Sequence, residues 1–157
     1  MQDNNNLSLK PRDVAVAHLL LRLLVGVIFL NFGFGKIMNI PVFVERTVKT
    51  LEASYIPAAL IRLGAYPVPI IEIVGGLLIT LGLSTRLALI LASTLMIMLA
   101  FGATSAQKPE LASSQLIYGI VLFTLLATCR FNWFSIDSWL RRKQRRIDPL
   151  DREEVLS

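Results

Sequence analysis

The dominant pattern along the chain is four long apolar runs, each about as long as a bilayer is thick. They cover approximately residues 14–36, 63–83, 87–106 and 111–129. A helix needs about 20 apolar residues to cross the hydrocarbon core. The third and fourth runs contain no charged residue, and the second contains only Glu72. The pattern predicts an all-α fold, an integral membrane four-helix bundle.

The segment between the first two runs has a different, amphipathic pattern. Asn39 and Pro41 are typical of a helix start. The apolar residues that follow share one face of a helix: Val44, Val48, Leu51 and Tyr55. Glu45 and Lys49 lie four apart on another face, so the segment is too polar to span. We expect an interfacial helix of about four turns after the first span, with an ordinary surface helix as the alternative.

Prolines and glycines shape the second span. Pro67 and Pro69 remove backbone donors and predict a kink just before Glu72. Gly75 and Gly76 are small enough to let another helix approach closely. The turn at residues 82–86 is short, so the second and third spans should be antiparallel neighbours.

Composition narrows the possible functions. The chain has 157 residues, enough for one domain, and 54% of them are hydrophobic. Its single cysteine excludes an internal disulfide and a self-contained dithiol centre, and its single histidine excludes a haem held by two histidines of this chain. No phosphate-binding loop, catalytic serine elbow or metal-ligand cluster is recognisable. We therefore assign no catalytic residue, no metal and no intrinsic cofactor.

The distribution of cations predicts the orientation. One side of the membrane would hold Lys10, Arg12, Arg86, Arg130 and the basic block at residues 141–146, and the other Lys36, Arg46, Lys49, Arg62 and Lys108. The bias places both termini in the cytoplasm, with residues 1–13 as an N-terminal segment and residues 131–157 as a basic tail. Basic residues beside a membrane helix are typical of contact with anionic lipids rather than nucleic acid. The expected location is the inner (plasma) membrane.

Charged residues within the spans are the main candidates for chemistry. Arg22, Phe29 and Lys36 lie on one stripe of the first helix, and Asn31 falls on the opposite side. A cation at this depth needs a partner or a route to the head groups, and we expect the partner to be Glu72. Lys36 lies near the outer end of the first helix and Asn31 at a depth comparable to that of Glu72, so a contact of Glu72 with either residue is geometrically reasonable.

The remaining candidates are more distant. Arg22 lies about three turns from the depth of Glu72, so it should reach head groups, another helix or the neighbourhood of Arg86. His18, one turn before Arg22, is interpreted as an interfacial residue. Ser114 and Tyr118 form a second-tier polar edge on the fourth span, for which ordinary interhelical hydrogen bonding is the alternative.

Three interpretations of the set formed by Arg22, Asn31, Lys36, Glu72 and Arg86 remain open. The first is a structural polar lock that fixes helix register. The second is a pocket for a lipid-soluble ligand such as a quinone, in which Glu72, Lys36 and Asn31 bind a carbonyl or hydroxyl head group. The third is a proton or solute path through the bundle.

The order of these motifs resembles the DoxX family. The resemblance rests on Arg22-Leu-Leu-Val-Gly26 with Phe29, Gly33, Gly35 and Lys36, on the run from Glu72 to Arg86, and on Glu110, Arg130-Phe and Ser135-Ile-Asp137. It covers about residues 17–140 and departs from the family near residues 128–134. It implies a four-helix membrane protein with Arg22, Lys36, Glu72 and Arg86 as signature residues. One branch resembles the small membrane subunit of thiosulfate:quinone oxidoreductase, and others are associated with membrane redox or oxidative-stress complexes.

The resemblance therefore implies an accessory or quinone-associated subunit of a membrane redox complex. Membrane lipids and other protein subunits are the expected partners, and a quinone or a lipid is the expected bound molecule. Electron chemistry would need a partner protein. The alternatives are a small-solute or lipid transporter, and a purely structural membrane subunit.

Overall fold

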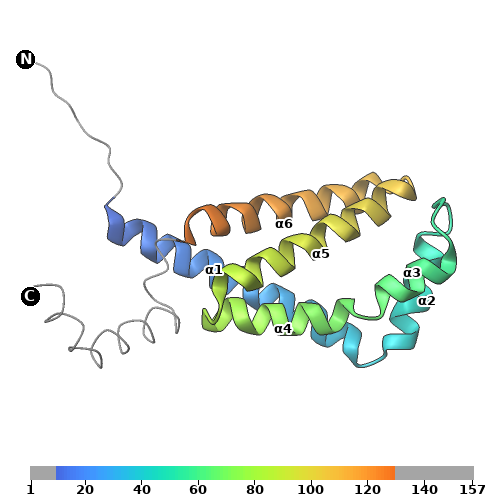
Figure 1. The fold of residues 1–157 in the computed structure, drawn as a ribbon, viewed down its shortest axis with the longest axis horizontal. Helices are drawn as coiled ribbons and strands as arrows, with labels where there is room; N and C mark the ends of the chain where they lie inside the picture. Colours follow the sequence, from blue (N-terminus) through green and yellow to red (C-terminus); the bar gives the residue numbers. More distant parts are fainter. Residues whose placement is uncertain (1–9, 130–157) are drawn as a thin grey trace, which may run out of the picture.

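The computed structural model describes residues 10–129, so the expectations for the first nine residues, for Arg130 and for the basic tail lie outside the described residues. Six helices follow one another: α1 (Pro11–Ile37), α2 (Ile40–Thr50), α3 (Ala58–Ala65), α4 (Val68–Leu81), α5 (Thr85–Ser105) and α6 (Pro109–Ala127). No strand is present within residues 10–129. In Figure 1, α1 lies beside α4, α5 pairs with α6, and α2 and α3 gather at the end of the bundle opposite the start of α1.

Four helical segments are long and apolar enough to cross a membrane. They are Pro11–Ile37, Ala58–Leu81, Thr85–Ser105 and Pro109–Ala127. Their bounds differ from the predicted ones by a few residues, most at the second span, which begins earlier because α3 extends it. The prediction of an all-α, multi-pass membrane protein is confirmed. Figure 1 also shows α1 beginning and α6 ending toward the same end of the bundle, as four spans require.

Glycines set the contact between α1 and α4. A β-carbon on Gly76 would lie 2.9 Å from the Gly26 carbonyl oxygen and 2.9 Å from the Leu30 backbone nitrogen. A β-carbon on Gly33 would lie 3.0 Å from the Pro69 carbonyl oxygen. The two backbones thus approach as closely as small residues permit. This contact, which we call the glycine seam, fixes the register of α1 against α4.

The predicted kink is present as a break between α3 and α4. Tyr66 and Pro67 separate the two helices, and Pro69 lies in the first turn of α4. Proline is tolerated in a first turn because its missing amide would have no partner there. The break places Glu72 in the second turn of α4, facing α1.

The turn between α4 and α5 is tight. Gly82 ends α4 in a left-handed conformation, with φ 69° and ψ 37°, which a residue without a β-carbon adopts at little cost. The chain reverses within Gly82–Ser84, and α4 and α5 pack against each other. The expected antiparallel neighbours are therefore present.

The segment predicted to be amphipathic is shorter than expected. Asn39 caps α2, its side-chain oxygen accepting from the Val42 amide at 3.3 Å. The helix ends at Thr50, so Tyr55 does not lie on its apolar face; its ring instead packs edge to face against Phe101. Ser54 shares a hydrogen bond of 2.7 Å with Ser105. The loop after α2 is thus held against the end of α5, and this contact replaces a fourth helical turn.

Candidate functional site

Lys36 and Glu72 form an ion pair between α1 and α4. The Lys36 Nζ donates to Glu72 Oε1 at 2.5 Å. The two side chains differ in exposure: 26% for Lys36 and 4% for Glu72. The contact expected from the sequence is therefore present, with the carboxylate enclosed by protein and the ammonium reaching it from a more open position.

Two aromatic rings lie close to the ammonium group of Lys36. Its Nζ lies 5.6 Å from the ring centre of Phe32 and 5.3 Å from that of Phe43. At such distances a cation is attracted to the electron-rich ring face. Phe32 comes from α1 and Phe43 from α2. The short helix after the first span therefore contributes directly to the environment of the ion pair.

Glu72 uses only one of its two carboxylate oxygens. Oε1 accepts from Lys36, whereas Oε2 is buried and has no hydrogen-bond partner among the described residues. A buried oxygen without a partner costs free energy, because its hydration is lost and nothing replaces it. This oxygen can accept a hydrogen bond from a hydroxyl or amine group of a bound molecule.

A cavity of about 440 Å³ adjoins the ion pair. Its walls come from α1, α4, α5 and α6, and Tyr118 stacks edge to face with both Phe29 and Phe32, at centroid distances of 6.5 and 6.3 Å. The lining combines these rings with polar groups: Lys36, Glu72, Ser114 and Gln115. An apolar pocket with few, converging polar groups is the usual form of a small-molecule site.

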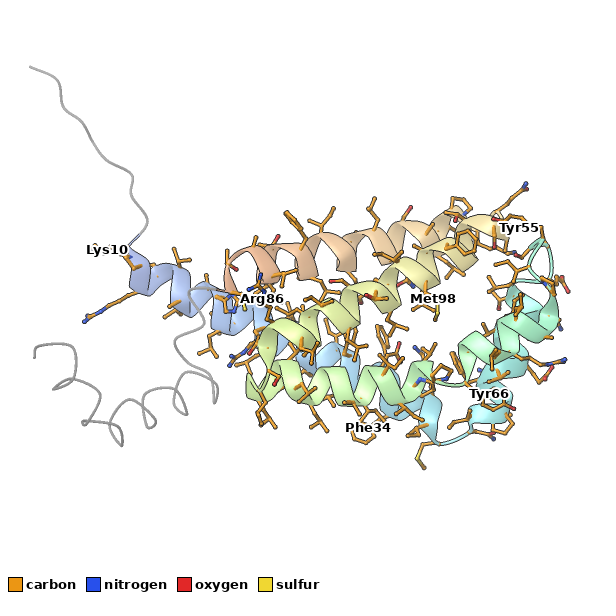
Figure 2. All side chains as sticks on the ribbon, in the orientation of Figure 1. Lys10, Phe34, Tyr55, Tyr66, Arg86 and Met98 are labelled. Atoms are coloured by element: carbon orange, nitrogen blue, oxygen red, sulfur yellow. The ribbon has the colours of Figure 1, made fainter. Side chains whose placement is uncertain are left out.

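Two of the candidates from the fourth span, Ser114 and Tyr118, line this cavity. The Ser114 hydroxyl donates to the Glu110 carbonyl of its own helix at 3.1 Å, so its oxygen is what it offers to the cavity. The structure does not bring Asn31 or Arg86 to the site. Both are exposed, and Figure 2 shows Arg86 near the end of the bundle where α4 joins α5.

Arg22 and His18 belong to a second buried polar region, toward the start of α1. Arg22 is 2% exposed and His18 is 4% exposed. Thr128, just after α6, shares a hydrogen bond of 2.9 Å with His18 Nδ1. The interpretation of His18 as an interfacial residue did not anticipate this enclosure between helices. Neither residue lines the cavity at the ion pair.

Sequence reasoning missed several residues of the site. Gln115 is the clearest case, because an amide within an apolar span is a visible signal in the sequence. Phe32 and Phe43 carried no signal, since aromatic residues are frequent in membrane helices. Within residues 10–129, no three histidine, cysteine, aspartate or glutamate side chains gather in a way that could hold a metal ion.

Comparison with known proteins identifies the family. The DoxX family model matches residues 17–105, which includes α1 to α5 from Ala17 onward. Neither a curated protein nor a solved structure matches the chain significantly. The match contains both partners of the ion pair, Lys36 and Glu72, whereas α6 and its cavity residues lie beyond it. Because the matched residues make up more than half of the 157, the chain is a member of the DoxX family.

Proposed function

We propose that this protein binds a lipid-soluble quinone between its helices and serves as an accessory subunit of a membrane redox complex. The observation that carries the proposal is the half-used carboxylate of Glu72. It is buried, it pairs with Lys36 through one oxygen while the other has no partner among the described residues, and Glu72 borders an aromatic cavity. Such a site presents one donor and one acceptor side by side.

The two forms of a quinone match this pair of groups. The carbonyl oxygen of the oxidised form accepts hydrogen bonds, and the Lys36 ammonium has further N–H groups beyond the one that Glu72 accepts. The hydroxyl of the reduced form donates, and Glu72 Oε2 accepts. The rings of Phe29, Phe32 and Tyr118 provide apolar contacts for a flat head group. These residues would therefore hold either form without rearrangement of the helices.

The charge of the site favours a neutral head group. Lys36 and Glu72 cancel each other within the cavity, so an anionic phosphate gains little attraction there. The chain has one cysteine and one histidine, which limits the redox centres that it can ligate by itself. The proposal therefore assigns the electron-donating or electron-accepting centre to a partner protein.

The first experiment tests for the ligand. The full chain is purified in mild detergent and extracted with organic solvent, and mass spectrometry identifies the bound quinones and any accompanying protein. Binding of added quinol is then followed by thermal denaturation, since a ligand that binds only the folded state raises the midpoint. Recovery of lipid alone, together with no shift on adding quinone or quinol, would contradict the proposal.

Glu72→Gln tests the role of the carboxylate. The amide keeps the size of the side chain but loses the charge that strengthens a hydrogen bond, so quinol should bind about tenfold more weakly. Glu45→Gln is the matched control, because Glu45 is 63% exposed and lies outside both the ion pair and its cavity. If both variants bind quinol like the wild type, Glu72 ionisation has no part in binding.

We also propose that the protein lies in the inner membrane with both termini in the cytoplasm. The distribution of cations supports this orientation, as does the even number of candidate spans. Single cysteines introduced at Leu83 and at Lys108, in a Cys129→Ser background, should label from opposite sides of the membrane. Labelling of the Leu83 site from the periplasmic side would reverse the orientation.

A further inference from the structure

A second cavity adjoins the one at the ion pair. It has a volume of about 320 Å³ and lies between α2, α3 and the end of α5 near Gly102. Three residues line both cavities: Lys36, Leu99 and Gln115. The shared residues place the two cavities next to each other, with Lys36 on the boundary between them.

The lining of the second cavity differs in character from that of the first. Apart from Lys36, Thr47 and Gln115, every residue that lines it is apolar or a glycine. It contains no carboxylate, and its apolar walls include Ile61, Val68 and Met98. Figure 2 shows Met98 on the half of α5 that extends toward α3. A chamber of this composition favours a hydrocarbon chain over a polar head group.

We propose that the second cavity holds the isoprenoid chain of the quinone whose head group binds at Lys36 and Glu72. This inference rests on the proposed function and extends it by assigning the tail. Its support is adjacency: a polar aromatic cavity and an apolar one share three lining residues. The neutral ion pair at the head disfavours the phosphate of a phospholipid, so an acyl chain is the less suitable occupant.

Gly64 offers a way to fill the tail cavity without touching the head site. It lines the second cavity and not the first, and a β-carbon there would meet no atom within 4 Å outside its own helix. Gly64→Phe therefore introduces a ring into open space rather than into packed atoms. Gly119→Phe on α6 is the matched control, because its β-carbon would also meet nothing within 4 Å and it lines neither cavity.

The test compares two ligands on the full-length protein in detergent. One is a benzoquinone ring without a tail, and the other carries the same ring with two isoprene units. In the wild type and in Gly119→Phe, the tail should tighten binding about tenfold. In Gly64→Phe the advantage of the tail should fall to about twofold or less, while the ring alone binds as in the wild type.

The outcomes separate the tail from the head. If the ring binds but the tail adds nothing in the wild type, the second cavity is not a tail site, and the proposed function stands. If neither ligand binds any of the three proteins, the proposed function fails and the tail assignment fails with it. Phospholipid that co-purifies with the wild type and is lost selectively from Gly64→Phe would assign the cavity to an acyl chain and overturn the inference.

Discussion

The contact between α1 and α4 has two halves that use the same two helices in opposite ways. Around Gly26 and Gly76 the backbones touch, and no space remains between them. Nearer the end of α1, at Lys36, and one turn before Gly76 on α4, at Glu72, the same pair borders a cavity of about 440 Å³. Small residues close the first half, and long and aromatic side chains keep the second half open. One helix pair thus provides both the rigid frame and the site.

The difference indicates how a membrane protein can hold charge at depth. The closed half fixes the register of α1 against α4. In this register Lys36 lies opposite Glu72. The open half then tolerates the ion pair because Lys36 is partly exposed and lies near two aromatic rings. A polar lock and a ligand site are therefore not exclusive interpretations of the same two residues.

The largest effect is expected in the open half, from Lys36→Met. Removal of the ammonium leaves a buried carboxylate without its partner, and loss of one partner of a buried pair costs about 3 kcal/mol or more. The free energy of unfolding in mixed detergent micelles measures the loss. The double variant Lys36→Met/Glu72→Met should recover most of it, because no carboxylate is then left without its partner, yet it should not bind quinol.

This double variant separates the two roles of the pair. If the double variant recovers the free energy of unfolding but does not bind quinol, the ion pair is a ligand site. A Lys36→Met variant as stable as the wild type would show that the ion pair does not hold the helices together.

A smaller effect is expected in the closed half, from Gly76→Ala. The added methyl group would lie 2.9 Å from backbone atoms of Gly26 and Leu30, which cannot move aside as a side chain can. Overpacking of this kind costs about 1–3 kcal/mol. Gly75→Ala is the control, because its β-carbon would meet no atom within 4 Å outside its own helix, so the better helix propensity of alanine should prevail. Equal unfolding free energies for the two variants would contradict the glycine seam.

The smallest effect is expected from Arg62→Gln. Arg62 is on α3 and takes no part in either half of the contact between α1 and α4. Arg62 donates two hydrogen bonds to Glu45, at 3.1 and 3.2 Å, and thereby joins α3 to α2. Both side chains are largely exposed, so solvent and salt screen the pair. The thermal midpoint should change only slightly at low salt and not at all at high salt. A large drop would mean that this bond, rather than apolar packing, holds α2 and α3 over the second cavity.

Much of the fold could be predicted because a bilayer restricts the possibilities. Apolar runs of this length form helices, and helical phase then decides which residues share a face. The pairing of Lys36 with Glu72 could be predicted because Glu72 is the only acidic residue within the apolar spans. Asn31 was included for its depth although its phase pointed away, and the structure leaves it exposed.

The walls of the site were harder to predict. Gln115 comes from α6, which is distant along the chain from Glu72, and Phe43 reaches Lys36 only because the chain turns between α1 and α2. The end of α2 at Thr50 was missed for a similar reason, because the hydrogen bond of Ser54 reaches Ser105 on α5.

The sequence by itself determined the number of spans, the positions of the breaks between helices, and the pairing of Lys36 with Glu72. These follow from the cost of leaving backbone and ionic groups without partners in hydrocarbon. Only the tertiary structure decided that Glu72 borders a cavity while one of its oxygens has no partner among the described residues, and that an apolar cavity adjoins the first at Lys36, Leu99 and Gln115. The shape of such a space depends on how six helices pack together, which no single stretch of sequence specifies.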